Sequence, residues 1–432
     1  MNNPPLLLGE QKKIRPGKLR YRIITLLKWL GFLLYFPLCF CWYAAQRVIF
    51  DKVYYPSEKE LILTTARIIF THSQRKTWKK ICLKFWRPTD PTDEAVRERG
   101  LFVKSYKYLL DGLAFNQKFA PGVYLGLASV FFDGKRIQRG RLIRKPAEDD
   151  LKLGEQYAVV MYTLKDQQRL DQQLIGSKVD AGFLAREIVA MHCQANKSSP
   201  GFGTSDRIFS KLKVNIKFYH QALEELRKQF PAEYAQYELV EIDEYLRDAC
   251  IGLSFHFAER YEQGHIRRCH GDLKVTNLWI RSALFPSRRR RLLALDSIDF
   301  NPEFCNIDTL SDVAMLAVDL ERLCSDPGFI DRFLGTYLDL SQEDLQNVKL
   351  LLEYYMTEKA MVCMYVSVLF DRHDGYENNS NYSLAMDYLR IAAAHARCLG
   401  KLLEIEKTEE VATPTETIQN GSASTAHHSD FR

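Results

Sequence analysis

The sequence has little that would mark a metal-stabilised or disulfide-stabilised protein. Its ten cysteines form no CxxC pair and no zinc-finger spacing, and most lie in apolar surroundings, where free cysteine behaves as a small hydrophobic residue. We therefore expect a reducing compartment and neither a structural nor a transition metal. The chain also has no internal repeat and no GxxxxGK string followed by Ser or Thr, so a P-loop is excluded.

Charge of one sign is not in large excess either. The net charge of +6 comes from 60 basic and 54 acidic residues, which is too small to indicate a nucleic-acid partner, and we expect none. The basic run from Arg288 to Arg291 is predicted to lie in a solvated hairpin turn rather than to contact nucleic acid or lipid. With 432 residues, the chain exceeds the usual size of a single core, so two lobes or domains are expected.

The apolar pattern beyond residue 50 predicts a sheet-rich part followed by a helical part. Residues 60–88 contain two β-rich runs around a polar turn, and "KKICLKFW" alternates charged and apolar positions as a half-buried strand does. Residues 93–120 have helical spacing, and strands are expected within 122–137 and 156–164. From Asp166 onward amphipathic helices dominate, including one long helix over 238–264 and another over 352–372.

One short stretch, "CHGDLKVTNLWI" at residues 269–280, carries a pattern with chemical meaning. Kinase-type phosphoryl transfer needs a carboxylate to accept a proton, an amide and a second carboxylate to hold magnesium, and a lysine on the phosphates. Asp272, Asn277, Asp296 and Lys84 supply that set. A His-Gly-Asp-x4-Asn string should arise by chance in about one chain in a thousand of this length. The spacing is therefore fairly specific, and a purely structural turn at Asp272 is the less favoured alternative.

At these residues the sequence resembles the aminoglycoside-phosphotransferase-like branch of the protein-kinase fold. "CHGDLKVTNLW" together with "LLALDSIDFNPEFCNIDTLSDVAMLAVDLE" looks like the phosphotransferase domain of bacterial proteins that join this domain to a P-loop ATP-binding domain. Weaker likeness extends back to about Tyr54. The resemblance implies an α+β, bilobal protein-kinase-like fold, with a small antiparallel-sheet N-lobe and a larger helical C-lobe. It also implies ATP and Mg²⁺ as cofactors.

The resemblance assigns roles position by position. Asp272 becomes the catalytic base, Asn277 and Asp296 become magnesium ligands, and Lys84 becomes the small-lobe lysine that contacts the phosphates. Lys79 and Lys80 are the alternatives to Lys84. Asp312 is expected to cap a helix, because Ser and Asp favour helix starts.

Three further positions follow from the same resemblance. Lys274 is a departure, because small-molecule kinases of this branch usually have His there, whereas protein kinases have a Lys that touches the γ-phosphate. Asp111 falls where the family has the acidic helix partner of the lysine, although its side chain is short. Met161 is expected at the hinge against the adenine. No Gly-rich loop covers the phosphates.

The N-terminus departs from an ordinary soluble chain. Residues 12–22 carry six basic side chains, and residues 23–46 contain a single charge, Lys28. The 18 residues from Trp29 to Gln46 carry no charge, which is at the short end of what spans a bilayer. Trp and Tyr in this run suit a membrane interface. We expect a membrane segment over residues 23–46, with a helix packed on the rest of the chain as the alternative.

The positive-inside rule constrains how such a segment is used. It keeps the basic arm in the cytosol, so a single span would place the remaining chain on the other side, where ATP is scarce. We therefore expect an interfacial anchor, with the kinase-like part membrane-associated and cytosolic. The expected units are a basic arm and anchor (1–50), an N-lobe (51–165), a C-lobe (166–405) and a disordered tail (406–432), which is rich in Glu, Thr and Ser.

These inferences combine into a function and one alternative. The first is an ATP- and Mg²⁺-dependent phosphotransferase that acts on a hydroxyl of a small molecule, a lipid headgroup or a protein, since a fold does not fix the acceptor. The second is a catalytically weak pseudokinase that serves as a membrane-tethered, nucleotide-binding scaffold. The missing Gly-rich loop and the short acidic partner favour the second, and intact Asp272, Asn277 and Asp296 favour the first.

Overall fold

A computed structural model of the chain describes part of the sequence. The described residues are 52–54, 61–63, 67–73, 80–86, 106–132, 136–152, 155–176, 179–237, 241–281, 290–326, 328–369 and 379–412. The predicted basic arm and membrane segment lie outside these ranges, as do Lys79, Arg288 and Arg289. Among the described residues, no helix is long and apolar enough to cross a membrane.

The N-terminal part is an antiparallel sheet. Its strands are β1 (Lys52–Tyr54), β2 (Leu61–Leu63), β3 (Arg67–Ser73), β4 (Lys80–Trp86), β5 (Tyr124–Phe132), β6 (Ile137–Ile143) and β7 (Tyr157–Tyr162), in the order β1-β6-β5-β7-β4-β3-β2. Every neighbouring pair is antiparallel. The central strand β7 begins with four buried residues, "YAVV", as expected of a strand covered on both faces. The strands predicted within 60–88, 122–137 and 156–164 are thereby confirmed, whereas β1 and nearly all of β6 were not predicted.

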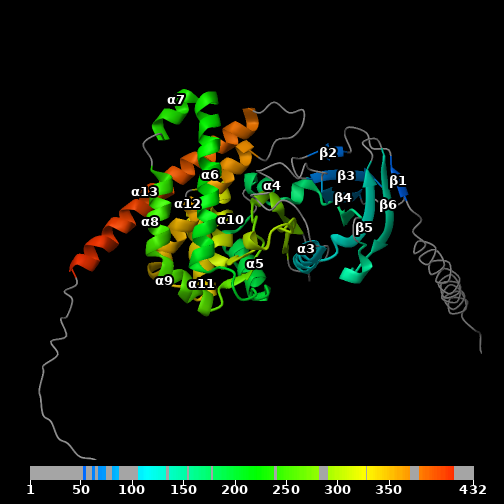
Figure 1. The fold of residues 1–432 in the computed structure, drawn as a ribbon, viewed down its shortest axis with the longest axis horizontal. Helices are drawn as coiled ribbons and strands as arrows, with labels where there is room; N and C mark the ends of the chain where they lie inside the picture. The colour runs from blue at the N-terminus through cyan, green and yellow to red at the C-terminus, as the bar shows by residue number, and fades with distance from the viewer. Residues whose placement is uncertain are drawn as a thin grey trace, which may run out of the picture.

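The C-terminal part is helical. Its helices are α4 (Leu170–Ile175), α5 (Ala181–Gln194), α6 (Ser205–Gln229), α7 (Pro231–Tyr234), α8 (Ile242–Gly252), α9 (Ser254–Glu262), α10 (Thr309–Leu323), α11 (Gly328–Ser341), α12 (Leu345–Leu369) and α13 (Asn379–Ala412). Residues 309–320 of α10 are all buried, so this helix lies inside the helical body. Figure 1 shows the sheet on one side and the helices α5 to α13 on the other.

Four short strands form two small sheets in the part of the chain that follows α9. β8 (Ile266–Arg268) pairs with β11 (Asn306–Asp308), and β9 (Leu278–Arg281) pairs with β10 (Arg291–Ala294), both antiparallel. The helix α3 (Tyr106–Phe119) lies at the boundary between the sheet and the helical body (Figure 1). Leu109 and Leu113 of α3 share one core cluster with Leu293 and Leu295 of the helical part. The β10 strand is therefore packed directly on α3.

Two boundaries differ from those predicted. The single helix predicted over 238–264 is two helices, α8 and α9, separated at buried Leu253, because Gly252 is a weak helix former at which α8 ends. Residues 406–412, predicted as the start of a disordered tail, are helical, because α13 continues to Ala412. The rest of the predicted tail lies outside the described residues.

Candidate active site

Asp272 and Asn277 lie together on the loop between β8 and β9. The Asn277 Nδ2 group donates to the main-chain carbonyl of Asp272 at 2.9 Å and to its carboxylate oxygen Oδ2 at 3.0 Å. The short 3₁₀ turn Val275–Asn277 sets this spacing. The Lys274 Nζ atom lies 3.1 Å from Asp272 Oδ1. The Asp272 side chain is 35% exposed, so it remains open to a ligand.

His270 braces the loop, as a structural histidine is expected to. Its Nε2 atom lies 2.8 Å from the carbonyl of Leu295, and its Nδ1 atom accepts from the main-chain N–H of Asp272 at 3.3 Å. Both contacts are satisfied by the neutral ring with its proton on Nε2. The side chain is fully buried. It therefore connects the loop of Asp272 to the strand end that carries Asp296.

Asp312 anchors the loop from below, which corrects the prediction that it caps a helix. The N-cap of α10 is Asp308, whose side chain accepts from Leu310 N–H. Asp312 lies one turn further along α10, where its Oδ2 accepts from His270 N–H at 3.0 Å and its Oδ1 from Gly271 N–H at 2.9 Å. Gly271 has φ +85°, and an added Cβ would lie 2.4 Å from the Phe304 carbonyl. The backbone conformation and the close approach at position 271 therefore require glycine.

Asp319 supports the other end of the loop. Its Oδ2 accepts from Val275 N–H at 2.8 Å, and its Oδ1 accepts from the Tyr388 hydroxyl at 2.6 Å. Because Asp312 and Asp319 are seven residues apart, they share one face of α10. The sequence analysis did not predict this role. Two acids seven residues apart, in a stretch of α10 (residues 309–320) with no other charged residue, were a usable signal.

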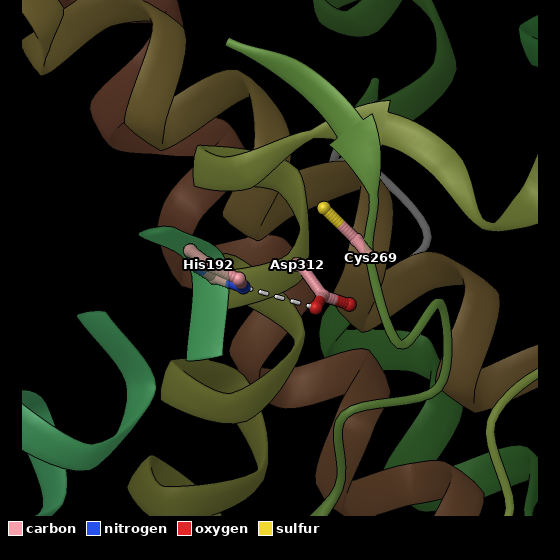
Figure 2. A group of neighbouring side chains, drawn as sticks. All are labelled: His192, Cys269 and Asp312. Atoms are coloured by element: carbon pink, nitrogen blue, oxygen red, sulfur yellow. Dashed lines mark hydrogen bonds and ion pairs between the residues drawn. The ribbon is translucent and has the colours of Figure 1, made fainter. Parts of the chain in front are cut away.

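The buried group His192, Cys269 and Asp312 has side-chain ligand atoms within 4.8 Å of one another, the spacing of a metal site (Figure 2). His192 Nε2 lies 3.2 Å from Asp312 Oδ2, and His192 Nδ1 lies 2.8 Å from the Tyr337 hydroxyl. Burial raises the pKa of the Cys269 thiol well above its usual value, and its Sγ donates to the Ile307 carbonyl at 3.5 Å. Burial alone would raise the pKa of Asp312, but the hydrogen bond and charge of His192 outweigh it and lower the pKa. We interpret the group as a hydrogen-bond network under the loop.

Lys84 and Asp296 meet across the two parts of the molecule. Lys84 is on β4, and its ammonium forms an ion pair with Asp296 Oδ1, with side-chain exposures of 13% and 45%. Asp296 lies two residues after the end of β10 and has φ +69°, an uncommon conformation for a residue with a side chain. The Tyr124 hydroxyl accepts from Asp296 N–H at 2.8 Å. Burial, and then the charge of Asp296, raise the pKa of Tyr124 well above its usual value, so this phenol stays neutral.

The two halves of the site are joined through the backbone. Leu295 N–H donates to the Asn277 carbonyl at 2.9 Å, and Ile298 N–H donates to the His270 carbonyl at 3.1 Å. The four residues proposed from the motif, Asp272, Asn277, Asp296 and Lys84, are therefore brought to one place.

Asp111 does not pair with Lys84 as the resemblance implied, and Met161 lies one residue before the end of β7. Asp111 pairs with Arg268, whose Nε lies 2.6 Å from Asp111 Oδ2, whereas the ion pair of Lys84 is with Asp296. Met161 lies inside the sheet, with Cys82 and Tyr124 as its partners on the two neighbouring strands. The chain leaves the sheet only after Tyr162, so residues 163–165 form the connection to the helical part.

Comparisons with known proteins give remote structural neighbours only. No family model matches the chain, and neither does any curated protein. A spectinomycin phosphotransferase, solved with ADP and spectinomycin, is 10% identical over 79% of this chain and 92% of its own, with a TM-score of 0.42. An amicoumacin kinase, solved with AMP-PNP, Ca²⁺ and Ami, is 11% identical over 79% of this chain and 90% of its own, with a TM-score of 0.36. Both are protein-kinase-like phosphotransferases, the class that the motif resembles. At these identities and scores, the similarity assigns no activity to this chain.

Proposed function

We propose that the chain is a phosphotransferase that uses ATP and Mg²⁺ to phosphorylate a hydroxyl group. The observation that carries the proposal is the meeting of Lys84 with Asp296 beside the Asp272–Asn277 pair, from three separate segments of the chain. This set matches the parts that phosphoryl transfer requires: a proton acceptor, oxygen ligands for a cation and a positive charge for the phosphates.

The donor atoms fit a hard cation. Mg²⁺ prefers oxygen ligands in near-octahedral geometry and keeps several waters, so two protein oxygens beside a nucleotide suffice. Asn277 uses its Nδ2 group for both hydrogen bonds to Asp272, which leaves its amide oxygen for a cation. The Asp296 carboxylate is 45% exposed and faces the Lys84 ammonium. When bound, the metal would offset the negative charge of the phosphates between these two ligands.

Each residue has a distinct role in the proposal. Asp272 accepts the proton of the acceptor hydroxyl, while the Asn277 amide and the Lys274 ammonium hold its carboxylate in place. Lys274 would also contact the transferred phosphate, as the lysine at this position does in protein kinases. Lys84 would exchange part of its contact with Asp296 for phosphate oxygens. The adenine would lie at the end of β7, near Met161 and the 163–165 connection.

Membrane association belongs to the proposal as well. The basic arm and the apolar run over residues 23–46 support an anchor that leaves the kinase-like part in the cytosol. A hydroxyl on a small molecule, a lipid headgroup or a protein remains the acceptor class. Fractionation of cells that express the full chain tests the anchor, because a chain that stays soluble without detergent would contradict it.

One observation favours the alternative, a catalytically weak pseudokinase that acts as a membrane-tethered scaffold. The acidic residue of α3, Asp111, is engaged with Arg268 and not with Lys84, so the ion pair typical of active protein kinases is absent among the described residues. Nucleotide binding without transfer would be expected in that case.

The decisive experiment uses the full chain in detergent with γ-labelled ATP, Mg²⁺ and a cell extract. Transfer of label to lipid, metabolite or protein supports the phosphotransferase and reports the acceptor class. ATP that stabilises the protein only with Mg²⁺, but yields no transfer and no hydrolysis, supports the scaffold.

A further inference from the structure

Arg268 occupies an unusual position for a charged side chain. It is the last residue of β8, two residues before His270, and only 6% of it is exposed. Burial alone would lower the pKa of its guanidinium, but neighbouring groups that include Asp111 outweigh this and raise it, so the group carries a buried positive charge. A buried charge is costly unless its donors are well satisfied. The partners of Arg268 therefore matter.

The guanidinium has four contacts that lie on three different segments. Its Nε donates to Asp111 Oδ2 at 2.6 Å, and its face covers the Phe115 ring at 4.7 Å, both on α3. One terminal nitrogen donates to the Cys269 carbonyl at 2.5 Å, directly before His270. The other donates to the Ile298 carbonyl at 2.8 Å, two residues after Asp296. One side chain thus connects α3 with both loops of the site.

The helix α3 is also in close contact with the Asp296 loop. The Asn116 side chain of α3 accepts from Ser297 N–H at 3.1 Å. A Cβ placed on Gly112 of α3 would lie 2.4 Å from the Asp299 Cβ atom, so the approach requires glycine. A shift of α3 would therefore be transmitted to the backbone on either side of Asp296.

We propose that Arg268 is a positioning residue that sets α3 against the loops of Asp272 and Asp296, with Asp111 as its adjustable anchor. Lys84 of the sheet pairs with Asp296 and not with α3. The Arg268–Asp111 pair therefore connects α3 to the loops of the helical part. The Asp111 side chain is 52% exposed, whereas the hydrogen bond to the Cys269 carbonyl is buried and the one to the Ile298 carbonyl is partly buried. The carboxylate is therefore the contact that can open and close. The role in catalysis rests on the proposed phosphotransferase function, but the mechanical coupling does not.

The test compares Asp111→Ala and Asp111→Asn in the full chain in detergent, since an exposed side chain can be changed without loss of the fold. Lys107→Ala, at an exposed position on the same helix, is the matched control. Hydrogen–deuterium exchange of the amides of Ser297 and Ile298 is the first readout, because both are hydrogen-bonded in the closed arrangement. We expect about five- to thirtyfold faster exchange in both Asp111 variants. Exchange equal to that of the unchanged chain, or an equal increase in Lys107→Ala, would overturn the proposal.

Turnover and metal dependence form the second readout. We expect kcat to fall about five- to thirtyfold in Asp111→Ala and half-maximal activity to need more Mg²⁺, with the KM for the acceptor unchanged. Arg268→Lys keeps the charge but cannot make all three hydrogen bonds, and its effect should not add to that of Asp111→Ala. Additive effects would overturn the coupling. Faster exchange in a chain that transfers no phosphate would retain the coupling and reject only the phosphotransferase.

Discussion

The two halves of the site are held by different kinds of interaction. The Asp272 loop rests on Asp312 and Asp319 of α10, which are 0% and 2% exposed and bind the loop through main-chain N–H groups. The Lys84–Asp296 pair has side-chain exposures of 13% and 45%, and Asp111 is 52% exposed. The backbone on either side of Asp296 also has a partly buried contact with Tyr124 and a buried one with Asn116. The ion pair of the Asp296 side chain with Lys84, however, is one that water can reach.

This difference in exposure fits the role proposed for each half, proton acceptance at Asp272 and binding of phosphates and a cation at Lys84 and Asp296. A proton acceptor works only when its position relative to the acceptor hydroxyl is set in advance, and buried hydrogen bonds to the backbone achieve that. Phosphates and a cation bring their own charges, so the groups that receive them must give up earlier partners. Exposed ion pairs contribute little to stability and can be exchanged at small cost.

The largest effect is expected at the fixed half, from Asp272→Asn. Turnover should fall about 10²- to 10⁴-fold, since a positioned general base is lost, while the affinity for ATP with Mg²⁺ stays nearly unchanged. Calorimetric titration paired with a transfer assay checks both. Asp331→Asn, at an exposed position on α11, is the control. Equal activity of Asp272→Asn and the unchanged chain would reduce the motif to a structural loop.

Removal of Asp312, which holds the Asp272 loop, should destabilise the fold strongly. Asp312→Ala leaves the N–H groups of His270 and Gly271 and the His192 ring without their buried acceptor. We expect the free energy of unfolding to fall by about 3–5 kcal/mol. Chemical denaturation measures it, and Asp312→Asn, which keeps one acceptor oxygen, should lose less. A loss below that of a typical surface substitution would contradict the assigned anchoring role.

In the half of the site formed by Lys84 and Asp296, a substitution should change ligand binding rather than stability. Lys84→Met should weaken binding of ATP with Mg²⁺ about 10- to 100-fold, the worth of a charge-assisted contact, and change the stability of the fold little. Lys80→Met, exposed at the start of the same strand, should bind as the unchanged chain does. If Lys80→Met loses binding and Lys84→Met keeps it, Lys84 is the wrong lysine.

The smallest effect concerns the helices that carry the fixed half. His395 of α13 lies between Glu353 of α12, at 2.7 Å, and Glu321 of α10, at 2.9 Å. Burial alone would lower its pKa, but the two carboxylates raise the pKa from 6.5 to about 9. A raised pKa stabilises the fold fully below pH 6.5, and this stabilisation is lost as the pH rises through about 9.

We therefore expect the free energy of unfolding of the unchanged chain to fall by about 2 kcal/mol more than that of His395→Gln between pH 6 and pH 10. Denaturant unfolding across that range measures the difference. His220→Gln, at an exposed histidine beside Asp243, is the control and should follow the unchanged chain. Parallel pH profiles for His395→Gln and the unchanged chain would show that the imidazolium contributes nothing.

The sequence determined those features that depend on local pattern. Alternation predicted the strand β4, and the β-rich runs predicted most of the remaining strands of the sheet. The His-Gly-Asp-x4-Asn spacing placed Asp272 beside Asn277, because five residues with one 3₁₀ turn bring the amide back to the carboxylate. It also pointed to Asp296 and Lys84 through the family resemblance, and the structure places these two side chains in contact.

The tertiary structure alone decided which charges meet across the fold. Asp312 was expected to cap a helix, yet the helix starts one turn earlier at Asp308, and burial turns Asp312 into the anchor of the loop. Asp111 was expected to pair with Lys84, yet Arg268, 157 residues away in the chain, is its partner. Which charged side chains pair depends on which of them are buried together. Here that is set by the packing of α3 on β10 and on the loops of the site. No local sequence pattern encodes this long-range contact.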